Sequence, residues 1–223
     1  MASEIVTYIG LNSFDLILYQ ACVLAKLQKR VLIIEDNDKL EQSPFSSMLE
    51  IPLGLEEKKD IITFRRIDFA FFQPGMEVVK NYDTVFISAG FSKAPYEFTV
   101  SKEIYVTDLF VQNMEAVKQI MNKSCCTRRS MVIRNNVFSY VNLDLLRDEM
   151  EGMVDQEETI IIDMNENDHF NALLCQHGQS LRFKLLSSNM KKYLLREIKH
   201  LCPEADKRVL HIAYKAASRG GAT

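Results

Sequence analysis

The sequence lacks the patterns of a disulfide framework, a zinc site, a nucleic-acid-binding face and a membrane span. Its five cysteines include no CxxC pair, and their odd number argues against a disulfide framework and a structural zinc site. Lysine and arginine do not outnumber the acids, because the formal net charge is -3, so no strongly basic nucleic-acid face is expected. With no long apolar run and no signal peptide before the first strand, we expect a cytoplasmic protein.

Catalytic motifs are also missing. No Ser, Thr or Cys stands beside a His in a nucleophile motif. Asp163, Glu166, Asp168 and His169 crowd the end of an expected strand, where an acid and base or a metal could sit. Capping of the following helix explains them more simply. His169 and His177 lie two turns apart on that helix, too far for one ion, so we expect no catalytic residue and no metal site.

The stretch from Ser3 to Asp38 is predicted to form a strand, a turn, a helix and a second strand. SEIVTYIG is an apolar, β-branched run that ends at Gly10, and FDLILYQACVLAKLQ carries apolar residues at helical spacing. KRVLIIEDND returns as a second apolar run, which completes a βαβ unit of a parallel sheet. Such a unit presents its first turn at the carboxyl edge of the sheet, where ligands usually bind.

That turn, GLNSFD, lacks the residues of a phosphate-binding loop. Such a loop needs several glycines for converging N–H groups, a Lys for charge and a Ser or Thr for Mg²⁺. Here Gly10 is the one glycine, no lysine is present, and Ser13 is the only hydroxyl. Asp15 adds negative charge where a helix start favours a bound anion. Ser13 and Asp15 are better explained as helix-capping residues, so the sequence favours a closed, capped turn.

The rest of the chain continues the alternation of strands and helices without a repeat or linker, which predicts one domain over residues 1–223. Its 47% apolar residues are ordinary for a globular protein. The fold class is a doubly wound, mostly parallel α/β sheet with helices on both faces. The expected strands are near Ile61–Phe64, Ile67–Phe69, Thr84–Ser88, Ile104 onward, Met131–Ile133 and Thr159–Asp163. The expected helices are Gly75–Asn81, Leu109–Met121 with Asp108 as its N-cap, Asn142–Met150, His169–His177 and two basic helices over about 189–219.

These segments resemble the MinD/ParA family of deviant Walker-A ATPases. IVTYIGLN and the helix through AKLQKRVLIIEDND are similar to the family's opening, and NYDTVFISAG stands where the family has its Walker-B strand. SKEIYVTDLFVQNMEAVKQIM, RSMVIRNNV and ETIIIDMNENDHFNALLCQHGQSL resemble the strands and helices that follow. The resemblance covers nearly the whole chain and implies a P-loop NTPase-like, Rossmann-like three-layer fold.

The chain departs from the family at the nucleotide-binding positions. The loop that holds Gly10, Asn12, Ser13 and Asp15 is about three residues shorter and has no signature lysine. Glu35 and Asn37 align with the acids of the family's VLLIDxD, with Asp36 between them, and Ser88 lies where the Walker-B strand should end in an acid. The resemblance therefore implies a degenerate member, a pseudo-ATPase that needs no cofactor.

The expected function is that of a non-catalytic scaffold or regulator. It would dock on protein components of a bacterial positioning, pilus or secretion machine, and the pilus-assembly (TadZ/CpaE-like) branch tolerates atypical loops. The expected partner-contacting surface is Asn12 to Asp15 with the loops after Asp36 and Gly90, and homodimerisation across this face is a further expectation.

An alternative is a nucleotide-binding switch ATPase that binds ATP and Mg²⁺ through a non-standard loop. In that hypothesis the rebuilt site would consist of Ser13, Lys93, Glu35 and Asp36.

The basic C-terminal helix has a narrow apolar stripe of Val209, Ile212, Ala213 and Ala216. The MinD branch ends in an amphipathic helix on the membrane, but this one has few large apolar residues. We expect marginal membrane affinity, packing on the domain or a partner, and any recruitment to the inner face of the membrane through a partner.

Overall fold

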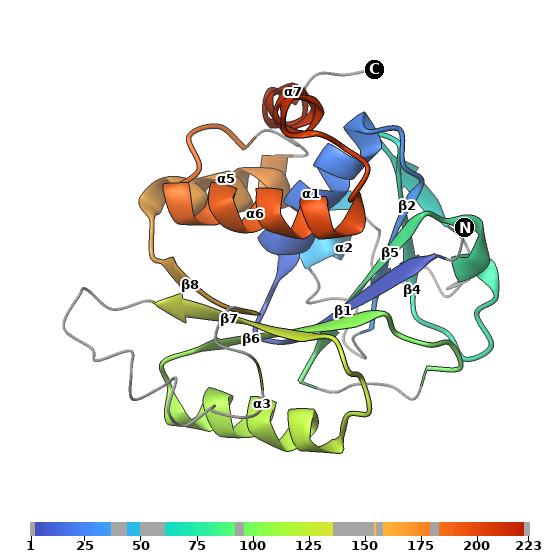
Figure 1. The fold of residues 1–223 in the computed structure, drawn as a ribbon, viewed down its shortest axis with the longest axis vertical. Helices are drawn as coiled ribbons and strands as arrows, with labels where there is room; N and C mark the ends of the chain where they lie inside the picture. Colours follow the sequence, from blue (N-terminus) through green and yellow to red (C-terminus); the bar gives the residue numbers. More distant parts are fainter. Residues whose placement is uncertain are drawn as a thin grey trace.

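The computed structural model describes residues 3–36, 44–49, 61–91, 96–135, 154, 158–178 and 183–220. Within them, a sheet of eight strands lies between two helical layers (Figure 1). The strands are β1 (Glu4–Gly10), β2 (Val31–Glu35), β3 (Ile62–Phe64), β4 (Ile67–Phe71), β5 (Thr84–Gly90), β6 (Lys102–Asp108), β7 (Arg129–Asn135) and β8 (Thr159–Asp163). The helices are α1 (Phe14–Lys26), α2 (Pro44–Leu49), α3 (Val111–Lys123), α5 (Glu166–Gly178), α6 (Ser188–Leu201), α7 (Lys207–Ser218) and the 3-10 helix η2 (Val78–Asn81).

The strand order is β3-β4-β2-β5-β1-β6-β7-β8, and every neighbouring pair is parallel except the β3–β4 hairpin. The predicted α/β fold class is confirmed. β1 lies at the centre between β5 and β6, so β5 separates the two strands of the first βαβ unit. α1, α2, α5, α6 and α7 cover one face of the sheet, and α3 lies on the other (Figure 1).

Several predicted elements need correction. The helix expected over 75–81 is only the short 3-10 helix η2, held by bonds from Lys80 N to Glu77 O and from Tyr82 N to Val79 O. Asp108 is not the N-cap of α3, because that position belongs to Phe110. Asp108 Oδ1 instead accepts from the Phe110 N–H and the Asn113 amide, which orders the turn ahead of the helix. The helix expected over 142–150 lies outside the described residues.

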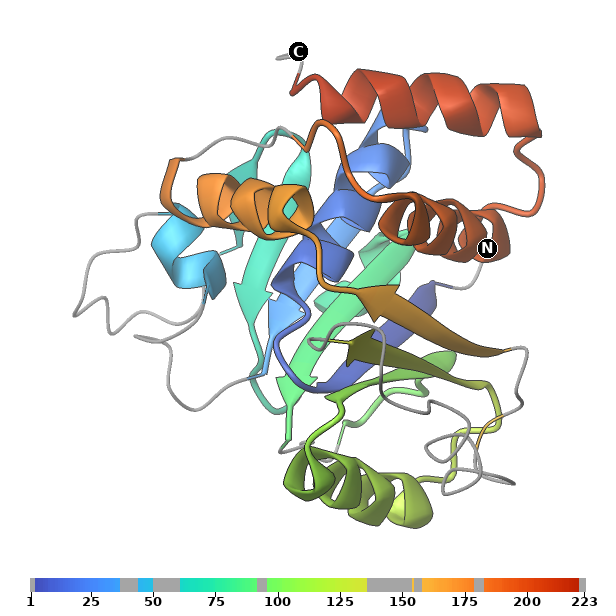
Figure 2. The same cartoon turned by 90° about the vertical axis from the view of Figure 1, so that its left-hand side faces the viewer.

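α1 is the buried centre of the helical layer. All residues from Phe14 to Ala25 are buried, because the sheet covers one side of the helix and α6 and α7 cover the other. Figure 2 shows α7 crossing the end of α1, and α5 beside α2. Under α1 the Tyr8 and Tyr193 hydroxyls lie 2.9 Å apart, and the Gln20 amide donates to Tyr8. Burial, then the nearby Glu197 carboxylate, raises the pKa of Tyr8, so this hydroxyl stays protonated.

The predicted apolar stripe of α7 divides between two sides of the helix. Ala213 is buried with Leu210, whereas Val209 and Ile212 face solvent. The helix therefore packs on the domain through one face and exposes a second, smaller apolar face. In the described part of the chain, no helix is long and apolar enough to cross a membrane.

Gly10 ends β1 where only a glycine fits. Its φ is 111°, and a Cβ there would lie 2.1 Å from the carbonyl oxygen of Val106 on β6. The next residue, Leu11, donates its N–H to the same oxygen at 2.9 Å. This close approach fixes where the chain leaves the sheet and enters the turn before α1.

We predict that Gly10→Ala destabilises the fold by more than about 3 kcal/mol, because it adds a backbone clash to a strained φ. Gly75→Ala is the matched control, since Gly75 also has a positive φ of 76°, but a Cβ added there would meet no atom within 4 Å. It should cost only about 1 kcal/mol. Urea unfolding measures both, and equal losses would contradict the role of the Val106 contact.

Candidate functional site

The predicted site residues meet at the carboxyl edge of the sheet. β2, β5 and β1 are neighbours in the sheet, so the turn after Gly10, the pair Glu35 and Asp36, and Ser88 lie on one edge. Two predicted participants, Asn37 and Lys93, lie outside the described residues, as do most residues of the expected partner-contacting loops.

The turn before α1 is closed, but not by Ser13, one of the two residues predicted to cap it. Ser13 occupies the N-cap position and is buried, yet its side chain makes no capping hydrogen bond. Its backbone has φ -118° and ψ 17° instead of the extended conformation usual for a capping residue. Asn12 takes this role, because its Oδ1 accepts the Phe14 N–H at 2.9 Å. Asp15 accepts the N–H of Leu16, also at 2.9 Å.

Asp15 also forms a two-pronged ion pair with Arg134 on β7. Arg134 Nη2 lies 2.5 Å from Asp15 Oδ1, and Nη1 lies 3.1 Å from Oδ2. Nη2 is also 3.4 Å from the carbonyl oxygen of Asn12. Burial opposes the charge of Arg134, but the Asp15 carboxylate outweighs it and raises the pKa of the guanidinium. The guanidinium of Arg134 therefore stays charged.

This ion pair occupies the place where a helix start would attract phosphate. The amino terminus of a helix favours an anion, because unpaired N–H groups and the helix dipole point there. Here the anion is the chain's own Asp15 carboxylate, which the surrounding fold buries. A phosphate at this position would meet a negative charge and an arginine that is already paired.

The two acids at the end of β2, Glu35 and Asp36, also have partners within the chain. Glu35 is buried, and Ser88, its register neighbour on β5, donates to Glu35 Oε1 at 3.3 Å. The Tyr96 hydroxyl donates to Asp36 Oδ2 at 2.7 Å, and the Tyr96 ring stacks on Phe98. Burial and this hydrogen bond raise the pKa of Tyr96, so it remains a donor. Ser88 thus donates a hydrogen bond to Glu35, and Tyr96 donates one to Asp36.

A hollow of about 280 Å³ lies beside the ion pair. Asp15 and Arg134 line it together with Asp163, Asp168 and His169, so the fold brings the acidic cluster of the sequence to the same place. The Asp163 carboxylate accepts from the amides of Asn135 and Asn189, at 2.9 and 2.8 Å.

The predicted capping of the helix after this cluster is made by an asparagine of the segment, whereas Asp163 and Asp168 bind other groups. Asn165 Oδ1 accepts the N–H groups at the start of α5. Asp168 binds the backbone N–H and hydroxyl of Ser187, ahead of α6. Among the described residues, no group of His, Cys, Asp and Glu is arranged to hold a metal.

Sequence reasoning missed Arg134. The segment RSMVIRNNV predicts only a strand, and nothing in the local pattern shows which residue its arginine meets. A signal was nevertheless present, because a charged residue inside an otherwise buried strand needs a partner of opposite charge.

No known protein family and no curated protein matches the sequence. Solved structures do match. The MinD cell division protein of Aquifex aeolicus superposes with a TM-score of 0.56 at 12% identity, over 92% of this chain and 99% of that one. A putative plasmid partition protein from Borrelia burgdorferi bound to AMPPNP has a TM-score of 0.56 at 12% identity, over 91% and 99%. Apo McdA from Cyanthece gives 0.58 at 10% identity, over 89% and 99%.

The fold is MinD/ParA-like. This likeness confirms the architecture that the sequence resemblance implied, and at these identities it concerns the fold alone. In this MinD/ParA-like fold, exposed apolar side chains flank the end of β1. Phe91 follows β5 and is 40% exposed, and Phe110 and Val111 follow β6 and are 62% and 68% exposed. The carboxyl edge thus combines charged side chains that have partners within the chain with exposed apolar side chains.

We predict that Arg134→Met destabilises the fold by about 2–3 kcal/mol, because it leaves the Asp15 carboxylate buried without its cation. Combining it with Asp15→Asn should recover part of this loss, since the uncompensated charge is then removed. Arg128→Met is the control, because Arg128 pairs with Glu4 at 3.5 Å on the exposed surface and should matter by less than about 1 kcal/mol. Strictly additive unfolding free energies for the two site substitutions would contradict the coupling.

Proposed function

We propose that this protein is a MinD/ParA-like scaffold or regulator without ATPase chemistry. It docks on protein components of a bacterial positioning, pilus or secretion machine, with residues 1–223 acting as one domain. The observation that carries the proposal is the Asp15–Arg134 ion pair, which puts a carboxylate at the start of α1.

The absence of ATPase chemistry follows from the charges at the carboxyl edge. Phosphoryl transfer depends on cations and N–H donors that neutralise the developing charge on the phosphate. Asp15 holds the guanidinium of Arg134, and β2 ends in Glu35, which is followed by Asp36. Such an edge repels a triphosphate unless a cation accompanies it. Gly10, Asn12 and Ser13 supply no positive charge.

Docking is supported by the apolar residues beside this edge. Phe91, Phe110 and Val111 keep large side chains in solvent around the ends of β5 and β6. Clustered exposed aromatic residues with a polar surround are typical of protein interfaces. The proposed docking surface consists of these three residues and the Asn12–Asp15 turn. A second copy of the chain or a different protein would bind there through direct contact, without a bridging nucleotide.

We expect no change in thermal unfolding when millimolar Mg²⁺ with ATP, ADP or GTP is added. A nucleotide at a hundredfold over its dissociation constant would stabilise the folded state by about 2.7 kcal/mol, which is easily measured. An intact MinD/ParA ATPase, tested in parallel, should show the shift. A shift with this protein would instead favour the alternative, a nucleotide-binding switch with a non-standard phosphate loop.

Partner binding should depend on the apolar residues of the docking surface. Phe110→Ser with Val111→Ser should lower the yield of chemically crosslinked partner proteins from the native cells at least about tenfold, because aromatic anchors dominate interface energies. Phe170→Ser is the matched control, since Phe170 is 59% exposed on α5. Equal yields from both variants would refute the docking surface. Sedimentation of the pure protein decides whether a second copy is the occupant.

A further inference from the structure

A second hollow lies at the opposite, amino edge of the sheet. Its volume is about 500 Å³, and it is bounded by the end of α1, the start of β2, the β3–β4 hairpin and the end of η2. Lys29, Arg30 and Arg66 supply three positive charges to its lining, against one acid, Asp68. Among the described residues, Ala25 and Val31 are its only aliphatic side chains. The hollow is therefore a polar, mainly cationic surface.

The acid in this hollow has its partners within the chain. The two oxygens of Asp68 accept from the hydroxyls of Thr63 at 2.5 Å and Tyr82 at 2.8 Å. Burial, together with this hydrogen bond, raises the pKa of Tyr82 to about 12, so the tyrosine stays a donor at neutral pH.

The two arginines of the hollow, Arg30 and Arg66, use few of their side-chain N–H donors within the chain. Arg66 Nη2 donates to Gln28 Oε1 at 2.9 Å, and Arg30 Nε lies 3.8 Å from Asp83, which is beyond hydrogen-bond distance. A guanidinium has five N–H donors. In the described part of the chain, most donors of both arginines therefore face solvent.

In the turn above the hollow, two arginines adopt a backbone conformation that arginine rarely adopts. Arg65 and Arg66 form the two-residue loop between β3 and β4, since Phe64 pairs with Ile67. Their φ angles are 50° and 66°, and turns with two positive φ values favour Asn-Gly. Gln28, across the hollow, has φ 61°. Such strained positions concentrate at functional sites, and here two arginines stand against the local preference of the turn.

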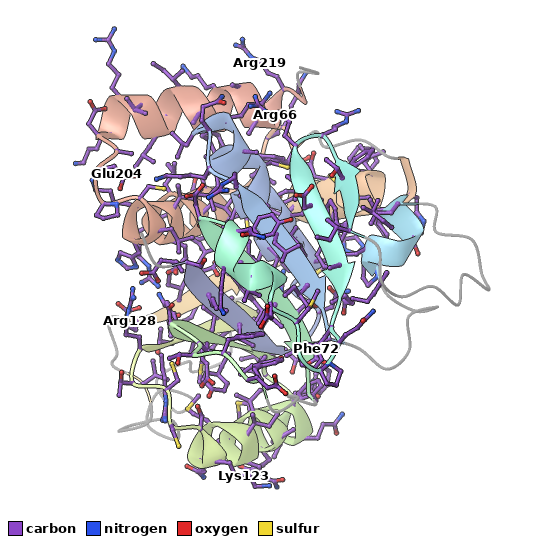
Figure 3. All side chains as sticks on the ribbon, turned by 90° about the vertical axis from the view of Figure 1, so that its right-hand side faces the viewer. Arg66, Phe72, Lys123, Arg128, Glu204 and Arg219 are labelled. Atoms are coloured by element: carbon purple, nitrogen blue, oxygen red, sulfur yellow. The ribbon has the colours of Figure 1, made fainter. Side chains whose placement is uncertain are left out.

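The positive surface extends from this turn to the end of α7. Arg65 Nη1 donates to the carbonyl oxygen of Gly220 at 3.3 Å, and its guanidinium lies 5.5 Å from the centre of the Phe64 ring. α7 itself contains Lys207, Arg208 and Lys215 and no acidic residue. Figure 3 shows Arg66 and Arg219 at the same end of the molecule, with Lys123 at the opposite end.

We propose that the amino-edge hollow and the arginine turn bind an acidic segment of a protein partner, whose carboxylates pair with Arg30 and Arg66. Guanidinium groups match carboxylates through two parallel hydrogen bonds. A free small ligand fits less well, because sites for such ligands are mostly apolar and enclose the ligand.

Other anionic partners also fit less well. Asp83 and Glu204 lie beside Arg30 and Lys29 and interrupt the positive charge, which disfavours the dense phosphates of nucleic acid. A membrane surface cannot enter a concave hollow. Because this surface is remote from the carboxyl edge, the proposal does not depend on the docking surface described above.

The test uses a fluorescein-labelled oligoglutamate peptide and fluorescence anisotropy. Arg66→Gly removes the guanidinium and suits the positive φ, so it should leave the melting temperature unchanged or raise it by up to about 4 °C. Its affinity for the peptide should nevertheless fall at least about fivefold. Arg30→Gln should weaken binding in the same way, whereas Lys123→Gln, the same loss of one charge on a remote exposed lysine, should not.

Labelled duplex DNA and phosphatidylserine vesicles are measured alongside the peptide. The proposal holds if the peptide binds best and if only the two arginine variants weaken it. It is overturned if the peptide does not bind, if all variants bind it equally, or if DNA or vesicles bind more tightly through the same arginines.

Discussion

The complete burial of α1 is the constraint on which the rest of this structure depends. A helix that is apolar on nearly every side cannot stop at the sheet surface, so α6 and α7 must cover it. The start of α1 is fixed by a backbone contact, the close approach of Gly10 to Val106 on β6. Because the first turn is buried as well, Asp15 cannot rely on water for its charge and must find a cation. Arg134 on β7 supplies it, and the same pair determines the chemistry of the carboxyl edge.

The chemistry of the carboxyl edge and the MinD/ParA-like architecture depend largely on different residues. The order of the strands depends on buried β-branched runs and on the buried length of α1, of which only the first turn lies at the edge. At the edge, the carboxylate of Asp15 takes the position that the start of α1 offers to an anion, and Ser88 stands beside Glu35. The anion-binding potential of the helix is therefore satisfied from within the chain.

The two edges of the sheet differ in chemistry. The carboxyl edge has paired carboxylates and open apolar side chains, with Phe110 the largest of these. The amino edge has guanidinium groups with free donors around a polar hollow. A domain with two such faces suits a component that joins two different partners, because each face excludes the partner that the other attracts.

The amino-acid sequence by itself determined the fold class and the two short strands that become β3 and β4, since periodicity and residue type are local properties. It did not show that Asn12 rather than Ser13 closes the first turn, because that choice depends on two backbone angles. It also did not pair Asp15 with Arg134, which are 119 positions apart in the chain. Only the tertiary structure decided this pairing and the hollow under Arg66, because strand order alone determines which distant side chains meet.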